Sequence, residues 1–319
     1  MRRTPIKVRY LVSIMCAGAA LVSCAGGPYS GSVPLEKALS DGSLDADTLG
    51  FLEAAASIAD FLAARFGLEK GVEAIRFISQ PRQGMAWRLV AVEDGVPANA
   101  RTTWHTSLAE AESAAAKLGE RATYMIEEVA HISGTGRGPG PLVSAHMNLS
   151  RTALVEEVVF RVLYEALDRK RSVEESEREA LALFLAEKAT QLYLVEKLSP
   201  ASPVLGNYIA QKRDERTFQT LLGGLRERFA NVLSQDLPAA ETERSLSFQT
   251  DVWLEDFRFN YSRRFLGDGF QAFGSDGVSA ALLAANDDPI PSYAELEAEY
   301  RRLGEDPVAF FGSLSSGGN

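Results

Sequence analysis

Apolar residues recur at helical spacing soon after the amino terminus. Between residues 48 and 66, apolar side chains such as Leu52 and Leu62 return every three or four positions, which predicts an amphipathic helix. Asp47 is placed to cap the start of this helix, and Gly67 is placed to end it. The first folded element of the chain is therefore expected to be a helix.

Alternating and continuous apolar runs follow, and they have the lengths of strands. Two short runs at 74–78 and 85–92 are separated by the breakers Pro81 and Gly84, and a third run covers 122–132. Between them, a capping box formed by Ser107 and Glu110 predicts a helix that extends to Leu118. Residues 35–150 are therefore expected to form a small α+β part.

The second half of the chain carries long amphipathic runs. Ser172 with Glu175 and Ser292 with Glu295 have the spacing of capping boxes. We expect helices over 154–169, 173–197, 207–233, 241–265, 278–285 and 294–303, followed by a final segment over 307–314 that carries Phe310 and Phe311. The predicted fold class is α+β and predominantly helical, with a helical part over 151–314 and a frayed tail over 315–319.

The amino terminus has the pattern of an export signal. Four basic residues precede position 10, and an apolar stretch from Tyr10 to Val22 follows. This stretch is shorter than the roughly 20 residues that a membrane-spanning helix needs, and the combination is typical of a secretory signal peptide. The segment Leu21–Cys24 resembles a lipobox. We therefore predict a lipoprotein signal peptide over 1–23 and lipid attachment at Cys24.

Cysteine content and charge agree with an exported, lipid-anchored chain. Cys16 lies inside the predicted signal, so the mature chain keeps only Cys24 and no disulfide is possible within it. Removing the four basic signal residues from a net charge of −10 leaves 29 Lys+Arg against 43 Asp+Glu, or −14. An acidic body argues against nucleic-acid binding. Residues 24–34, rich in Gly, Ser and Pro, are expected to be a flexible tether.

Common catalytic motifs are absent from the sequence. It contains no HExxH, CxxC or GxSxG pattern, and the glycine-rich segment from Gly134 to Gly140 lacks the ending of a P-loop. We expect that segment to be a surface loop. The three histidines, His105, His131 and His146, do not share a metal-ligand spacing. We expect each to be a surface or half-buried residue.

The run from Leu154 to Ala166 resembles the motif helix of the predicted aminopeptidases of bacterial lipoproteins, a family of HExxH gluzincin-like metallopeptidases. The segment Glu177–Leu183 is similar to the family's second helix, which carries the glutamate of the expected third metal ligand. Fainter similarities extend over most of the mature chain, including 58–68, the Trp-bearing run 85–91, the segments 133–136 and 141–144, and 280–311. The resemblance implies a metallopeptidase-like fold.

The sequence departs from this family where the chemistry would occur. With Phe160 as the reference, the two histidine positions hold Arg161 and Glu165, the position of the catalytic base holds Val162, and only Glu179 keeps its residue type. Valine cannot accept a proton, and arginine brings a permanent positive charge. Arg161 and Glu165 are spaced to pair on one helix face, either in a cluster with Glu179 that replaces the metal or as an ordinary solvated pair.

The resemblance and its departures predict a membrane-anchored lipoprotein that is catalytically inactive, binds no cofactor, and has a peptide or an envelope protein as its ligand. If the cell has two membranes, the expected place is the outer membrane or the periplasm-facing surface. One alternative is an active zinc aminopeptidase with a rearranged site that uses Glu165, Glu179 and His146. Another is a purely structural envelope lipoprotein.

Overall fold

The computed structural model describes most of the chain beyond the amino terminus. The described residues are 31–79, 84–93, 95–119, 122–131, 138–170, 173–276, 278–286 and 293–314. The predicted signal peptide, Cys24, most of the predicted tether and the predicted tail therefore lie outside the described residues, as do Ser172 and Ser292.

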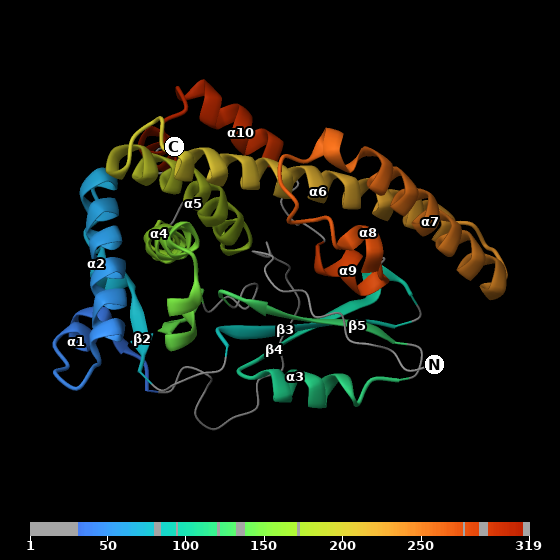
Figure 1. Ribbon diagram of the computed structural model, residues 1–319, viewed down its shortest axis with the longest axis horizontal. Helices are drawn as coiled ribbons and strands as arrows, with labels where there is room; N and C mark the ends of the chain where they lie inside the picture. The colour runs from blue at the N-terminus through green and yellow to red at the C-terminus, as the bar shows by residue number, and fades with distance from the viewer. Residues whose placement is uncertain are drawn as a thin grey trace.

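Two small sheets form the β part of the molecule. In the larger sheet, β3 (Ala86–Val92) lies between β4 (Ala100–His105) and β5 (Thr123–Val129), and both pairings are antiparallel. In the smaller sheet, β2 (Arg76–Ile78) pairs antiparallel with β1 (Val33–Pro34) and parallel with β6 (Leu142–Val143). The larger sheet is covered on one side by α3 (Leu108–Ala115) and on the other by α9 (Ala280–Ala285) (Figure 1).

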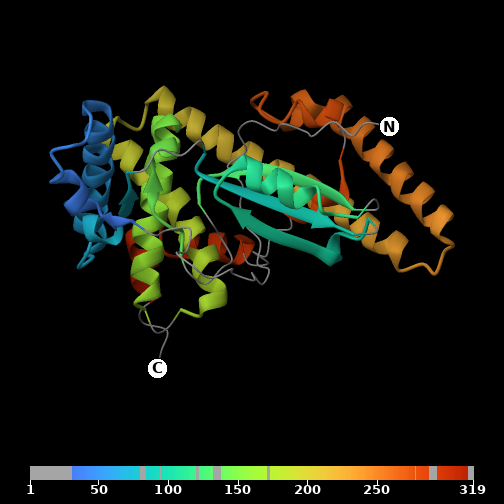
Figure 2. The same ribbon diagram turned by 90° about the horizontal axis from the view of Figure 1, so that it is seen from below.

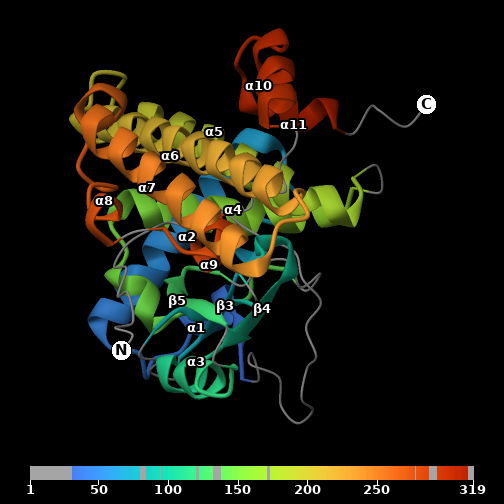
Figure 3. The ribbon, with the colours of Figure 1, turned by 90° about the vertical axis from the view of Figure 1, so that its right-hand side faces the viewer.

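Helices make up most of the structure, and the long ones lie in the second half of the chain. In Figure 3, α6 (Pro203–Leu233) and α7 (Ala239–Arg264) lie together above the larger sheet, with α3 below it. The remaining helices are α1 (Leu35–Leu39), α2 (Ala46–Phe66), α4 (Arg151–Asp168), α5 (Glu175–Lys197), α8 (Phe273–Asp276), α10 (Tyr293–Arg302) and α11 (Pro307–Ser313), with 3₁₀ turns at Val72–Ala74, Pro97–Asn99 and Ser144–Asn148. This confirms the α+β, predominantly helical class.

Two apolar clusters hold these elements together, and both contain residues from each half of the sequence. One joins α1 and α2 to α4, α5, α10 and α11. The other joins Val90, Val92 and Met125 of the larger sheet to α6, α7 and α9. Figure 2 shows α2 beside α4 at one end and the larger sheet beside α6 and α7 at the other. The predicted α+β and helical parts therefore share their cores.

Local details differ from the sequence expectations at several element ends. Asp45, not Asp47, caps α2 by accepting a hydrogen bond from the Thr48 N–H at 2.8 Å. Gly67 ends the helix as expected, with a left-handed φ of 63°. Among the helices that the structure describes, none combines the length and apolar composition needed to cross a bilayer.

Candidate functional site

The predicted site residues of the motif helix lie on α4, most of which is buried. The helix begins after Ser150, whose side chain accepts a hydrogen bond from the Ala153 N–H at 3.2 Å. It packs between α2 and α5. Val162, at the position that would hold a catalytic base, is fully buried in the apolar cluster. Arg161 is only 2% exposed, so its charge must be compensated inside the protein.

The Arg161 guanidinium is compensated by one carboxylate and several carbonyl groups. It forms an ion pair with Glu157, which is 6% exposed and lies one turn earlier on α4. Arg161 Nε donates to Gly140 O at 3.1 Å, and Nη2 lies 3.4 Å from Ala130 O and 3.5 Å from Pro141 O. The guanidinium therefore joins α4 to the two segments that precede it.

Glu165 does not belong to this cluster, which corrects the predicted pairing of Arg161 with Glu165. The Glu165 side chain is 43% exposed and accepts a hydrogen bond from Arg169 at 2.8 Å. Helical side chains lean toward the amino terminus of the helix, so a long arginine reaches the residue four positions earlier. Arg161 accordingly pairs with Glu157, and Arg169 pairs with Glu165 in the same way.

Glu179 of α5, the one position that keeps the residue type of the resembled family, is half-buried. The pKa of the His131 imidazole is lowered to about 4, chiefly by burial and then by the Arg161 charge, whereas the Glu179 charge acts in the opposite direction. Both charged groups are thus close enough to influence the same imidazole. The structure buries Arg161 and leaves Glu165 outside the cluster.

His131 is the third member of the cluster, with Arg161 and Glu157. It is 8% exposed, and its Nδ1 lies 3.1 Å from Glu157 Oε2. With a pKa of about 4 the ring is neutral at pH 7, so we assign the Nδ1 proton to the hydrogen bond with the carboxylate. Its ring packs against Phe160 with centroids 4.3 Å apart. Glu157 therefore accepts from both an imidazole and a guanidinium.

His146 lies beside the cluster, and both of its ring nitrogens form hydrogen bonds with backbone groups. Its Nδ1 accepts from the Val143 N–H at 3.0 Å, which leaves Nε2 to donate to Ala130 O at 2.8 Å. Burial lowers its pKa to about 3, and Arg161, whose Nη2 lies 3.3 Å from Nε2, acts in the same direction. His146 is thus a neutral structural residue at pH 7.

The expectation of surface or half-buried histidines is therefore wrong for His131 and His146. Both are buried because their ring nitrogens have fixed polar partners, which the sequence spacing does not reveal. His105 is half-buried as expected, and its Nε2 lies 3.0 Å from Thr103 Oγ1.

The residues of the zinc alternative do not fit a metal ion. Glu165 lies at the surface with Arg169. Both nitrogens of His146 are used by backbone groups, and the guanidinium of Arg161 lies beside that ring. A divalent cation placed there would be repelled by a charge that cannot be removed by deprotonation. The described residues include no group of three His, Cys, Asp or Glu side chains arranged to hold a metal.

The glycine-rich segment contributes to the cluster through its carboxyl-terminal end. Residues 132–137, with Gly134 and Gly136, lie outside the described residues. Gly138 has a φ of +77°, and a Cβ added there would lie 3.2 Å from the Tyr164 ring. Gly140 supplies a carbonyl to Arg161. The segment therefore ends against α4, with glycine required where the backbone approaches the Tyr164 side chain.

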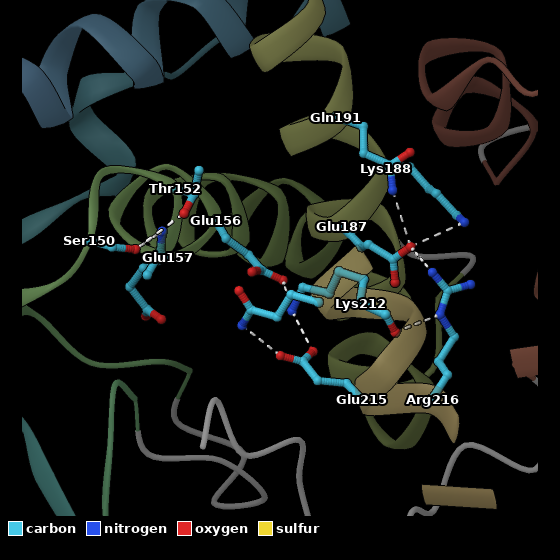
Figure 4. A network of polar contacts seen from close by, with 12 residues as sticks. Ser150, Thr152, Glu156, Glu157, Glu187, Lys188, Gln191, Lys212, Glu215 and Arg216 are labelled. Carbon is cyan, nitrogen blue, oxygen red and sulfur yellow. Dashed lines mark hydrogen bonds and ion pairs between the residues drawn. The ribbon is translucent and has the colours of Figure 1, made fainter. Parts of the chain in front are cut away.

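A second buried polar network, which the sequence reasoning missed, joins α4 to α5 and α6 (Figure 4). Lys212 lies 2.8 Å from Glu156 and 2.9 Å from Glu215. Burial alone would lower the pKa of the Lys212 amine, but the two carboxylates outweigh it and the pKa is raised. Lys212 is therefore a permanent cation between two acids.

The same polar network also joins α5 to α10. Glu187 of α5 accepts from Arg216 at 2.8 Å and from the Tyr293 hydroxyl at 2.7 Å. Lys188 lies 2.8 Å from Glu297 of α10. A sequence signal did exist, because Glu187 and Lys188 interrupt the long apolar run of α5. Adjacent charges inside such a run indicate buried ion pairs between helices.

Comparison with known proteins gave no match to a family model, to a curated protein or to a solved structure. The resemblance to the lipoprotein aminopeptidases therefore stays a prediction.

Proposed function

We propose that this chain is a lipid-anchored envelope protein related to the lipoprotein aminopeptidases, and that it does not catalyse peptide hydrolysis. The observation that supports this most strongly is the state of Arg161. A buried guanidinium, compensated by Glu157 and by backbone carbonyls, stands where the resemblance places a metal ligand. Its function is then to bind a peptide or another envelope protein, with the acidic body facing the periplasm in a cell with two membranes.

The proposal predicts no aminopeptidase activity. Full-length protein extracted from membranes should release no amine from amino-acid anilides or short peptides, with or without added zinc. The reason is that Val162 cannot act as a base and Arg161 opposes a cation. Sustained turnover that a chelator abolishes, and that returns with zinc, would contradict the proposal.

The anchoring part of the proposal is tested at Cys24, which lies outside the described residues. Cys24→Ala should remove the site of lipid attachment, so the protein should be recovered in the soluble envelope fraction or accumulate as the uncleaved precursor. Cys16→Ala is the matched control, because Cys16 lies within the predicted signal and should leave anchoring unchanged. Mass spectrometry that finds an unmodified Cys24 in membrane-bound native protein would reject the lipid anchor.

A further inference from the structure

Helix α7 carries apolar side chains on two opposite faces. One face packs on α6 and the second apolar cluster through residues such as Trp253 and Phe257. On the other face Phe248 is 62% exposed, Val252 37% and Phe259 75%. Figures 2 and 3 show α7 at the outside of the molecule, along α6. Large exposed side chains aligned on one helix face indicate an interaction surface.

Two charged residues near the end of α7 lie symmetrically about Phe259. Glu255 and Arg263 lie four residues before and after it, so they share its helix face. Leu266, which is 61% exposed, lies beyond the end of α7 at Arg264 and does not belong to this helix face. The acidic position before Phe259 thus has a basic counterpart at the same distance after it.

The two charged residues of this face are available for a partner. In the part of the chain that the structure describes, neither Glu255 nor Arg263 forms an ion pair. The neighbouring Asp256 differs, because it is already paired with Arg264 at 2.8 Å. Arg263 instead lies over the Phe259 ring, with its guanidinium carbon 5.6 Å from the centroid. A carboxylate approaching the Phe259 ring would therefore meet this guanidinium.

We propose that α7 pairs antiparallel with α7 of a second copy of this chain, about a two-fold axis at Phe259. A two-fold interface requires that each contact occur twice with the two residues exchanged. An axis at Phe259 places that ring against its counterpart and Glu255 against Arg263 twice. The charge pattern of one chain therefore complements itself in this register.

The proposed contact is small, and it rests on the proposed lipid anchor for its strength. Few side chains take part, so two freely diffusing copies would associate weakly. Confinement to one membrane raises the effective concentration of the copies and favours pairing without any further contact. The association is accordingly a property of the anchored protein.

Disulfide trapping in membranes tests the pairing directly. Phe259→Cys places one thiol at the axis in each copy, so mild oxidation should link two chains through position 259. Phe248→Cys is the matched control, because Phe248 is also exposed on this face but lies beyond the proposed contact. We expect at least about fivefold more linked dimer for F259C than for F248C. Equal linking of the two variants, or linking of F259C to a different protein, would overturn the proposal.

Charge reversal then tests the register. In the F259C background, Glu255→Arg should lower dimer formation about fivefold, since it places arginine against arginine twice, and Arg263→Glu should do the same. The variant with both changes restores opposite charges across the axis and should recover dimer formation. Failure of the double change to recover what each single change loses would reject this register.

The native chain, without an introduced cysteine, shows whether a negative result counts against the dimer or against the lipid anchor. If Cys24 carries lipid, that chain should form no linked dimer. Linking through Cys24 would show a free thiol and would count against the anchor, whereas the difference between F259C and F248C would still decide the pairing.

Discussion

Arg161→Ala should lower the free energy of unfolding by about 3–5 kcal/mol. The substitution removes the guanidinium but leaves Glu157 buried, and within the described residues only the His131 hydrogen bond then compensates its charge. It also leaves the Gly140 carbonyl without the donor that Arg161 supplies. The loss should be measured by urea denaturation at pH 7, where the midpoint should fall without a change in slope.

Arg169→Ala is the matched control for Arg161→Ala. The Arg169–Glu165 pair lies on the same helix with the same spacing and direction, but both side chains are more than one-third exposed. Such a pair contributes under about 1 kcal/mol. If both substitutions cost the same small amount, the Arg161 cluster would not have the buried, compensated character described above.

Acid should destabilise the folded protein through its two buried histidines. The folded pKa values of His131 and His146 are about 4 and about 3, against an ordinary value of about 6.5 in the unfolded chain. Because the folded pKa values are depressed, the unfolded state binds more protons below pH 6.5. Stability is then fully present above that pH and is lost as the pH falls toward 4. From pH 7 to pH 4.5 the loss should be about 5 kcal/mol, roughly half from each histidine.

His131→Gln separates the contributions of the two imidazoles. A glutamine amide can donate to Glu157 but does not titrate, so the loss between pH 7 and pH 4.5 should fall to about half. Urea denaturation at several pH values measures both proteins. A pH dependence that is the same in the variant, or stability that is constant between pH 7 and pH 5 in the native protein, would contradict the assignment of neutral buried histidines.

The helices of this chain could be predicted because their signals are local. The 3.6-residue apolar period and end signals such as Ser107 and Gly67 act within a few residues. Strand β4 (Ala100–His105) could not be predicted because it is an edge strand of the larger sheet in which every residue is exposed or only half-buried. The short β1 and β6 were missed because pairing with β2, distant in sequence, defines them.

The candidate site could be predicted only in part. The resemblance singled out both Arg161 and Glu179, whereas the spacing of four residues predicted Glu165 as the partner of Arg161, which is wrong. Both Glu157 and Glu165 lie four residues from Arg161, and which of them pairs with it depends on which of them is buried. His131 contacts Glu157, 26 positions away, and His146 contacts Ala130, 16 positions away, so no helical period could reveal these contacts.

We propose that an internal ion cluster occupies the place where the resemblance puts a metal. It combines a buried cation on α4 with the carboxylate of Glu157 and two neutral histidines. Such an arrangement is stable without a metal and would be disrupted by one, because Arg161 keeps its charge at every accessible pH.

The most direct test is the zinc content of the full-length protein, extracted from membranes and purified without added metal or chelator. Elemental mass spectrometry should find far less than one zinc per chain, both in the native protein and in His146→Ala. About one zinc per native chain, lost on His146→Ala, would contradict the account and favour a working metal site.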